Sequence, residues 1–178
     1  TCLFMTCCSA VMSQAVPVPF TADNWNLEGT QFTQETYKGK QCIVFKTGAI
    51  ISKGIELRDG VIELDMSFPD GRGFPGVGFR IIDNSNFEHF YVRPHQSGNP
   101  DATQYTPVFN NYAGWQLYHG AGYSEATPLK PDEWHHIKID IHGLEAEIYF
   151  DDMSKPLIKV TGLKQGWKGN NIALIPGN

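Results

Sequence analysis

The sequence predicts an all-β protein of antiparallel strands, either a two-sheet β-sandwich or a β-barrel. Aromatic residues make up 12% of the 178 residues, beside 18 glycines and 11 prolines, and this composition favours strands joined by many turns. Short segments that alternate polar and apolar residues recur at intervals of about ten residues, with turn-forming residues between them. No long amphipathic helix is apparent, so strands have to supply the core.

The first 15 residues differ from the rest of the chain. Residues 2–12 are mostly small or apolar and carry no charge, and Ser13 and Ala15 are small residues of the kind that a signal peptidase reads. We therefore expect residues 1–15 to be a signal peptide and residues 16–178 to form a single domain. A lipoprotein signal acylated at Cys7 or Cys8 is the alternative, with a poorer match before the cysteine.

Cysteine use agrees with export. Of the four cysteines, only Cys42 follows the expected leader, so the mature chain has no internal disulfide and no cysteine-based zinc site. The apolar run around Cys42 predicts a buried structural thiol. An exported domain without disulfides favours a bacterial protein that is secreted, periplasmic or held at the cell surface.

The charge balance excludes one class of partner. The chain carries 14 basic and 19 acidic residues, a net charge of −5, and no cluster of lysine or arginine. Binding of nucleic acid needs a concentrated basic surface, so we expect no nucleic-acid partner. We also expect no transmembrane segment once the leader is removed.

Two hairpins are predicted from alternation and turn residues. Residues 41–46 and 49–53 are expected to pair around the turn at Thr47 and Gly48. Residues 134–142 and 146–150 are expected to pair around a tight connection. Two further strands are predicted at residues 157–160 and 171–175.

Three successive segments are predicted to form an antiparallel meander, at residues 61–68, 76–83 and 87–93. In the first, Ile62 and Leu64 face inward, and in the second Val77 and Phe79 face inward while Arg80 faces outward. The side chains expected to share one face of this meander are Glu63, Asp65, Arg80, His89, Tyr91 and Arg93.

The stretch of residues 87–119 holds most of the groups that could bind a ligand. A long polar connection lies there between two aromatic-bearing strands, the layout in which loops carry binding groups on a rigid scaffold. Aromatic faces stack on sugar rings, and amides and guanidinium groups pair with hydroxyls. The alternative is a structural loop whose amides satisfy its own backbone. The candidate ligand-binding residues are Arg80, Tyr91, Arg93, His95, Gln96, Asp101, Gln104, Tyr105, Gln116 and Tyr118.

A strand is expected to restart over residues 115–119. Alternation would then place Gln116 and Tyr118 on one face and Trp115 on the other. We favour Gln116 and Tyr118 at the ligand site, with Trp115 partly in the core.

The segments WHHIKIDIHG, residues 134–143, and AEIYFDD, residues 146–152, resemble the strand pair of laminin-G-like and concanavalin A-like lectin/glucanase jelly rolls. The segments DGVIELDMSF and GVGFRIIDNSNFEHFYVRPH also resemble that superfamily, in particular its bacterial members grouped with 3-keto-disaccharide hydrolase-like domains. The resemblance covers roughly residues 25–175. It implies that residues 16–178 form a concanavalin A-like domain whose concave side or loop rim binds carbohydrate, sometimes with calcium.

The same resemblance implies a further strand after residues 171–175, and this chain stops at Asn178. We therefore expect either a clipped C-terminus or an open sheet edge at residues 171–175.

Glu63 and Asp65 are candidate catalytic residues. They lie two apart on a predicted strand, which places their carboxyl groups roughly 6 to 7 Å apart on one face, a separation that suits glycoside hydrolysis. Jelly-roll glucanases resemble the pattern Glu-x-Asp-x-x-Glu, and Phe68 stands at its last position. A cross-strand charge ladder with Arg80 and Arg93 is therefore the favoured interpretation.

His95 is the remaining candidate for acid–base chemistry. A loop that folds back would bring it together with Asp101 and His119, and such a group can bind a metal or exchange protons. Isolated surface residues are the favoured alternative. The turn residues that could bind calcium are Asp70, Asp83 and Asn84.

Together these patterns predict an exported carbohydrate-binding, lectin-like module without catalysis of its own. One alternative is a glycoside-cleaving hydrolase of the 3-keto-disaccharide type, with Glu63, Asp65 or His95 as its acid–base group. The other is a protein-interaction module of the laminin-G type, which predicts an exposed apolar patch.

Overall fold

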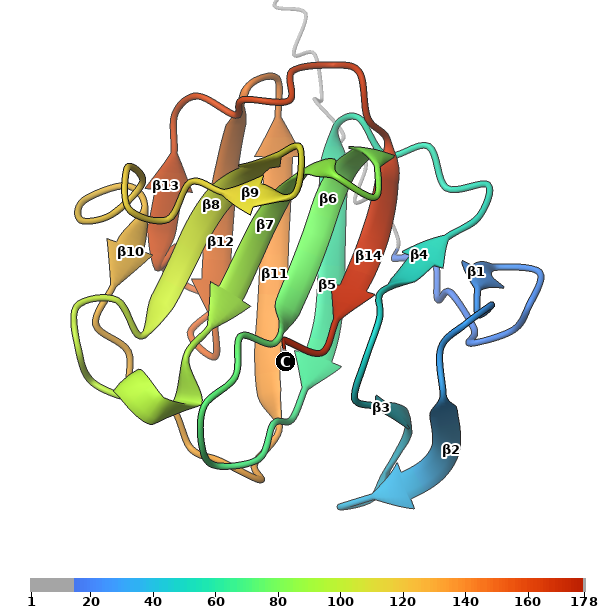
Figure 1. Cartoon of the computed structure of the whole chain (residues 1–178). Helices are drawn as coiled ribbons and strands as arrows, with labels where there is room; N and C mark the ends of the chain where they lie inside the picture. Colours follow the sequence, from blue (N-terminus) through green and yellow to red (C-terminus); the bar gives the residue numbers. More distant parts are fainter. Residues whose placement is uncertain (1–14, 178) are drawn as a thin grey trace, which may run out of the picture.

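The computed structural model describes residues 15–177 of the chain. All but the last residue of the predicted signal peptide therefore lie outside the described residues. Two antiparallel sheets face each other and enclose the core (Figure 1). The predicted all-β, two-sheet antiparallel sandwich is confirmed.

The larger sheet has the strand order β1-β4-β14-β6-β7-β8-β10, and β9 pairs with β8 beside this path. Its strands are β1 (Trp25–Asn26), β4 (Ile50–Ser52), β6 (Gly76–Asp83), β7 (Asn86–Val92), β8 (Thr103–Phe109), β9 (Tyr112–Ala113), β10 (Ser124–Glu125) and β14 (Asn171–Ile175).

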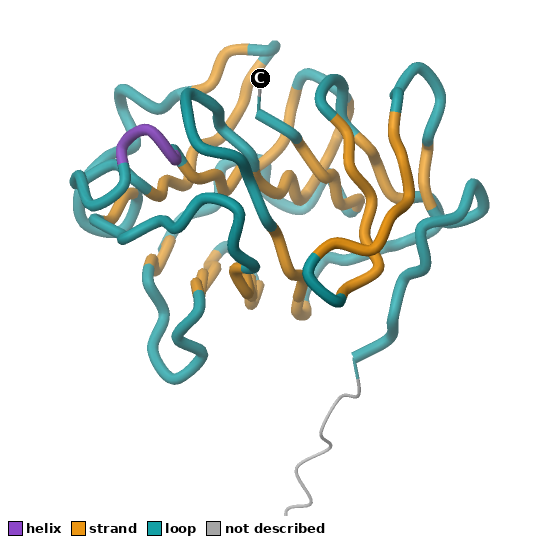
Figure 2. The backbone as a smooth tube through the Cα atoms, turned by 90° about the horizontal axis from the view of Figure 1, so that it is seen from below, coloured by secondary structure: helices purple, strands orange, loops and turns teal. Residues whose placement is uncertain are grey.

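The smaller sheet has the order β13-β12-β11-β5. Its strands are β5 (Gly60–Met66), β11 (His135–His142), β12 (Glu145–Phe150) and β13 (Ile158–Val160). A separate hairpin is made of β2 (Phe32–Tyr37) and β3 (Lys40–Phe45). Figure 2 shows the short helix η1 (Pro94–Gln96) in purple at one end of the molecule, among the loops that join the strands.

The core lies between the two sheets and follows the alternation of the strands. Ile137, Ile139 and Ile141 of β11 are fully buried, and their neighbours in sequence are partly or fully exposed. The larger sheet contributes Phe79 and Phe90, which are also fully buried. Each such side chain contributes on the order of 2 kcal/mol through removal of apolar surface from water.

The hairpin predicted at residues 134–150 is confirmed. Ile139 of β11 pairs with Ile148 of β12, and the connection turns through Gly143, whose φ is 60°. The carboxylate of Asp59 accepts a hydrogen bond of 2.8 Å from the Gly143 amide, which ties this turn to the start of β5.

The predicted meander is wrong in its first strand. β5 pairs with β11 in the smaller sheet, where Leu64 lies opposite Ile137, and the meander consists of β6, β7 and β8. Alternation assigns one face of a strand to the core and does not select the neighbouring strand. The residues between β5 and β6 include Pro69 and Pro75, and they carry the chain from one sheet to the other.

The hairpin predicted at residues 41–53 is also wrong. β3 pairs with β2, so that Cys42 lies opposite Glu35, and β4 joins the larger sheet between β1 and β14. The β2–β3 hairpin forms a sheet of its own, and Cys42 is only partly buried there rather than fully enclosed. Burial nevertheless raises the pKa of the Cys42 thiol, and the nearby Glu35 raises it further.

The open edge expected at residues 171–175 is not present. β14 lies in the interior of the larger sheet between β4 and β6, and β1 and β10 end the path of this sheet. A strand that is last in the sequence has entered the middle of the sheet, a placement that local pattern does not determine.

Arg80 was expected on the outward face of β6, but its side chain is fully buried. Its φ is 49°, in the left-handed region, and the β6–β7 pairing shifts register between Phe79 and Asp83. The guanidinium donates to the carbonyl oxygens of Gly166 at 2.6 Å, of Arg58 at 3.3 Å, and of Gly143. These carbonyls precede β14, precede β5 and follow β11, so one side chain connects both sheets.

We expect Arg80→Ala to lower the free energy of unfolding by about 3 kcal/mol or more, because the three carbonyl oxygens lose their donor. Urea denaturation of the purified chain measures this change. Asp59→Asn is the matched control, because it removes the negative charge and keeps an oxygen that can accept the Gly143 amide. The Asp59 carboxylate lies 3.9 Å from the guanidinium and is half exposed, so the loss of this ion pair should cost about 0.5 kcal/mol or less. Equal losses in the two variants would contradict the structural role of Arg80.

Candidate ligand-binding site

A pocket of about 410 Å³ opens beside the first residues of β8. We call it the rim pocket. Residues 100–124 build it: the loop after η1, the strand β8 that follows this loop, the connection from β9 to β10, and the first residue of β10. The residues that line it are Pro100, Asp101, Gln104, Trp115, Gln116, His119, Gly120 and Ser124.

Hydrogen bonds at both ends of the loop after η1 hold it against the neighbouring segments. The amide of Arg93 donates to Ala102 at 2.7 Å, which joins the end of β7 to the start of β8. The hydroxyl of Ser97 donates to the Leu129 carbonyl at 3.0 Å and accepts the Leu129 amide at 2.8 Å. These bonds place Asp101 at the mouth of the pocket on an ordered segment.

A buried network of side chains lies beneath the pocket. The Tyr91 hydroxyl donates to Oε1 of Gln104 at 2.8 Å, and Arg93 donates to the same oxygen at 2.5 Å and to the Tyr91 hydroxyl at 2.8 Å. A second guanidinium nitrogen of Arg93 donates to the carbonyl of Asp101 at 2.5 Å. Burial raises the pKa of Tyr91 to about 12, so its hydroxyl remains a donor at neutral pH.

Gln104 connects this network to the segment 114–120. Its Nε2 donates to the carbonyl oxygens of Trp115, at 2.9 Å, and of Tyr118. The amides of Leu117 and Tyr118 both bond to the carbonyl of Gly114, at 2.8 and 3.1 Å. The segment is therefore a turn held from below by a fully bonded, buried amide.

The strand expected over residues 115–119 does not form, and the assignment of faces was wrong. In the turn, Trp115, Gln116 and His119 line one pocket together, although alternation would separate Trp115 and His119 from Gln116. The Trp115 side chain is 48% exposed and is not part of the core. Tyr118 instead packs edge-on against Tyr123, with ring centroids 5.3 Å apart.

The groups that remain accessible in the rim pocket are an aromatic ring and several polar side chains. The Trp115 ring lies 6.0 Å from the Arg93 guanidinium. Gln116 and His119 are exposed, and the carboxylate of Asp101 is 45% exposed. An exposed indole beside an amide, an imidazole and a carboxylate offers an apolar platform, hydrogen-bond donors and hydrogen-bond acceptors in one place.

The other predicted ligand-binding residues lie apart from this surface. Arg80 and Tyr105 belong to the core, and the Tyr105 hydroxyl donates to Glu88 at 2.6 Å. His95 is exposed and packs edge-on against Phe74 at 5.7 Å, and Gln96 accepts a bond from the Asn99 side chain at 2.6 Å. Of the ten candidates, Asp101, Gln104 and Gln116 line the pocket, while Tyr91 and Arg93 support it.

The sequence pattern missed Trp115 as a member of the site. Convergence of Asp101 and His119 was the less favoured alternative for these residues, and both line the rim pocket, whereas His95 does not. Gly114 and Gly120 flank residues 115–119 and are a turn signal that weighs against a strand.

Glu63 and Asp65 lie on the outward face of the smaller sheet, away from Arg80 and Arg93. His136 of β11 lies between them, with Nδ1 at 2.9 Å from Asp65 and Nε2 at 3.2 Å from Glu63. The predicted charge ladder therefore has other partners than expected, because β5 neighbours β11.

The hydrogen bonds of this ladder shift its pKa values. The bond to Asp65, followed by that to Glu63, raises the pKa of His136. Burial alone would raise the pKa of Asp65, but the hydrogen bonds from Lys40 and His136 outweigh it and lower the pKa. Neither carboxylate lines the rim pocket.

The predicted calcium ligands lie in turns whose polar groups are already paired. Asp70 accepts the Gly71 amide at 2.8 Å, and Asp83 accepts the Ser85 amide at 2.7 Å, while Asn84 is exposed. Within residues 15–177, no cluster of three or more His, Cys, Asp or Glu side chains has the arrangement of a metal site. Calcium binding stays a prediction.

Comparison with known proteins places the fold. No protein-family model matches the chain. No curated protein matches it either. Solved structures do match. The carbohydrate-binding module CBM66 from Bacillus subtilis aligns with a TM-score of 0.61 and 18% identity, over 86% of this chain and 89% of that chain.

Two further solved structures share the sandwich. Domain 4 of AbnA, a GH43 extracellular arabinanase from Geobacillus stearothermophilus in complex with arabinotriose, aligns with a TM-score of 0.53 and 13% identity, over 83% of this chain and 67% of that chain. The toad ovary galectin in complex with thio-digalactose aligns with a TM-score of 0.51 and 15% identity, over 73% of this chain and 92% of that chain. At these identities the likeness establishes the fold alone.

The described residues also include no helix with the length and hydropathy that a membrane crossing requires.

We expect Gln104→Ala to release the turn of residues 114–120 and to lower the free energy of unfolding by about 2 kcal/mol, because four hydrogen bonds are lost in a buried place. Hydrogen exchange should speed up at the amides of Leu117 and Tyr118. Gln116→Ala is the matched control, since this neighbouring glutamine is exposed and its loss should leave exchange and stability unchanged. Unchanged exchange in both variants would contradict the anchoring role of Gln104.

We expect the stabilisation from His136 to depend on pH. Its folded pKa is raised above the unfolded value of 6.5, so its contribution is complete below that value and is lost as pH rises through the folded pKa. The stability difference between the parent chain and His136→Gln should therefore be larger at about pH 6 than at about pH 9. His142→Gln is the control, on an exposed histidine of the same strand. A difference that grows with pH would contradict this.

Proposed function

We propose that this protein is a carbohydrate-binding module that takes a sugar ring at the rim pocket and does not itself cleave it. The observation that carries the proposal is the half-exposed Trp115, held in place by the bond from Gln104 to its carbonyl. Polar groups with free surface surround this ring, as hydroxyl recognition requires. The solved neighbours named above, two of them carbohydrate complexes, support it.

The chemistry at the rim pocket favours binding over hydrolysis. The usual glycosidase mechanisms need two carboxyl groups that flank the scissile bond. Among the residues that line the rim pocket, Asp101 supplies the single carboxylate. Glu63 and Asp65, considered above as a catalytic pair, share one histidine on the outward face of the smaller sheet.

Export and family placement are part of the same proposal. We infer an extracellular, periplasmic or surface protein of the concanavalin A-like superfamily, related to the laminin-G-like and 3-keto-disaccharide hydrolase-like domains that its segments resemble. A polysaccharide ligand outside the cell fits the predicted signal peptide at residues 1–15 and the single cysteine, Cys42, after it.

A protein-interaction role is the second candidate function. Tyr112 in β9 and Leu117 in the connection after it are each 81% exposed, so that with Trp115 three exposed apolar side chains fall within residues 112–117. Exposed apolar side chains that form one contiguous patch mark interaction surfaces. Such a role predicts binding without any sugar dependence.

The test is a glycan array probed with the chain from Val16 onward, followed by calorimetry on the neutral oligosaccharide that binds most strongly. We expect Trp115→Ala to weaken this binding at least about tenfold, equivalent to roughly 1.4 kcal/mol, because the stacking platform is lost.

Trp167→Ala is the matched control, since Trp167 is 49% exposed but lies outside the rim pocket, and its affinity should stay within about twofold of the parent chain. No binding to any glycan on the array, or an affinity of Trp115→Ala equal to that of the parent chain, would contradict the proposal and favour a protein partner.

A further inference from the structure

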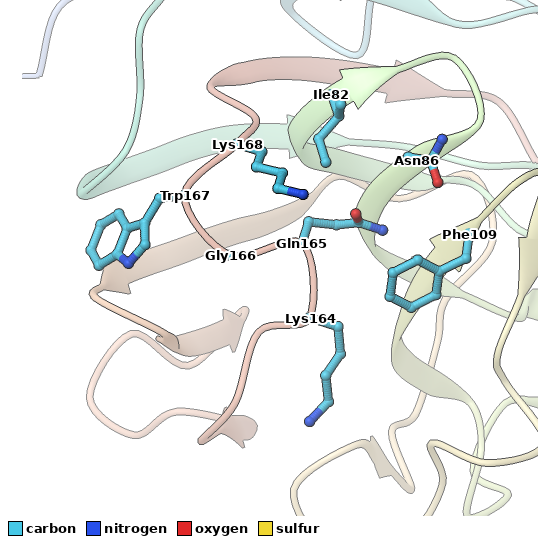
Figure 3. Close-up of a pocket in the computed structure, with 8 residues that line it drawn as sticks. All are labelled: Ile82, Asn86, Phe109, Lys164, Gln165, Gly166, Trp167 and Lys168. Atoms are coloured by element: carbon cyan, nitrogen blue, oxygen red, sulfur yellow. The ribbon is translucent and has the colours of Figure 1, made fainter.

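A second pocket lies beside the last residue of β8, whereas the rim pocket lies beside the first residues of this strand (Figure 3). Its volume is about 500 Å³. The end of β6, the start of β7, the end of β8, and the loop between β13 and β14 contribute its walls. We call it the loop pocket, and the lining residues that matter here are Ile82, Asn86, Phe109, Gln165, Trp167 and Lys168.

The floor of the loop pocket is rigid. Gln165 is buried, and its side-chain amide donates to the Val108 carbonyl at 2.6 Å. Its backbone amide donates to Glu88 at 2.7 Å, and this fully buried carboxylate also accepts the Tyr105 hydroxyl at 2.6 Å. In Figure 3 the side-chain oxygen of Gln165 lies between Lys168 and Asn86, and so it can accept a hydrogen bond from a ligand.

One aromatic ring supplies apolar surface next to Gln165. Phe109 is 41% exposed, and Figure 3 shows its ring on the side of Gln165 where Asn86 lies. The Trp167 ring lies on the opposite side and points away from Gln165, and the Arg80 guanidinium lies 4.9 Å from its centroid. An exposed aromatic face such as that of Phe109 makes contact with the C–H groups of a sugar ring.

The loop pocket is positively charged on an acidic protein. Lys164 and Lys168 both line it, and within the described part of the chain neither ammonium group lies within 4.0 Å of a carboxylate. Lys40, by contrast, is paired with Asp65 at 2.6 Å. Figure 3 shows the Lys168 ammonium beside Gln165, above the floor of the pocket, whereas Lys164 extends away from Gln165, and the Lys164 ammonium lies 5.9 Å from the centroid of the Tyr118 ring. Lys168 is therefore the cation that can attract an anionic group to the floor of the pocket, on a chain whose net charge is −5.

We propose that the loop pocket binds an anionic sugar unit, one that carries a carboxylate or a sulfate group. Lys168 pairs with the anionic group, the Gln165 oxygen accepts a hydroxyl, and Phe109 contacts the apolar face of the ring. This site goes beyond the proposed function at the rim pocket and does not depend on it, since the two pockets share no lining residue.

The test is a nuclear magnetic resonance titration of the ¹⁵N-labelled chain with D-glucuronate, D-glucose 6-sulfate, D-glucose and inorganic sulfate. We expect the side-chain amide of Gln165 and the backbone amides of Gly166 and Lys168 to shift. Glucuronate, glucose 6-sulfate or both should bind at least about tenfold more tightly than glucose, and higher salt should weaken them. The stronger of the two identifies the anionic group.

Three variants make the assignment specific. Lys168→Gln should reduce the affinity for the anionic sugars to that for glucose. Lys155→Gln, on an exposed lysine elsewhere, should leave the titration unchanged, and Trp115→Ala, in the rim pocket, should leave the shifts of the Gly166 and Lys168 amides unchanged. A loss of neutral-glycan binding in Trp115→Ala alone therefore reports on the rim pocket, and a loss in Lys168→Gln alone reports on the loop pocket.

Any of three results would overturn the inference: anionic sugars that bind no better than glucose, a Lys168→Gln chain that binds as the parent does, or inorganic sulfate alone that binds as tightly as the best sugar. The last result would identify a simple anion site without sugar recognition.

Discussion

The buried guanidinium of Arg80 is the interaction on which the arrangement of the two sheets and their loops depends. It has no exposed surface, and it donates to carbonyls that belong to the approaches of β14 and β5 and to the turn after β11. Loops cannot bury their carbonyls without donors, so this cation allows three connections to meet at one end of the sandwich. Gly169 completes the arrangement, because a side chain there would meet the Arg80 carbonyl at 2.1 Å.

Both exposed tryptophans lie near a buried arginine. Trp167 lies 4.9 Å from Arg80, and Trp115 lies 6.0 Å from Arg93. In each case the guanidinium donates to backbone carbonyls, so it is a fixed support for the ring. A preorganised ring loses little conformational freedom when a ligand stacks on it, which favours binding by a small pocket.

The larger sheet contains buried polar side chains, whose removal from water costs free energy. Two of them, Glu88 and Gln104, form hydrogen bonds to loops. Glu88 holds the loop between β13 and β14, and burial raises the pKa of its carboxyl group. Gln104 holds the connection from β9 to β10 with all of its hydrogen bonds satisfied by protein groups. Burial also lowers the pKa of His89 to about 3, so this histidine is neutral under physiological conditions. The larger sheet thus positions loops with polar side chains that a purely apolar core would lack.

Local sequence is enough to predict the position of most strands and the face of each strand that is apolar. The isoleucines of β11 alternate inward as their spacing predicts, and Asp101, Gln104 and Gln116, which are candidate ligand-binding residues by their chemistry, line the rim pocket. Composition and the two-residue period of side chains are properties of a single strand, so they predict its apolar face whichever strands lie beside it.

Pairing between strands that are not joined by a short turn, and the side chains that such pairing brings together, follow from the tertiary structure. β5 pairs with β11 and not with β6, so the hydrogen-bond partner of Glu63 and Asp65 is His136 and not Arg80. Arg80 turned inward through a register shift, and Trp115 turned outward because Gln104, a strand away, holds its carbonyl. The positions of these side chains depend on hydrogen bonds between separate segments of the chain, and the alternation of residues within one strand does not predict such partners.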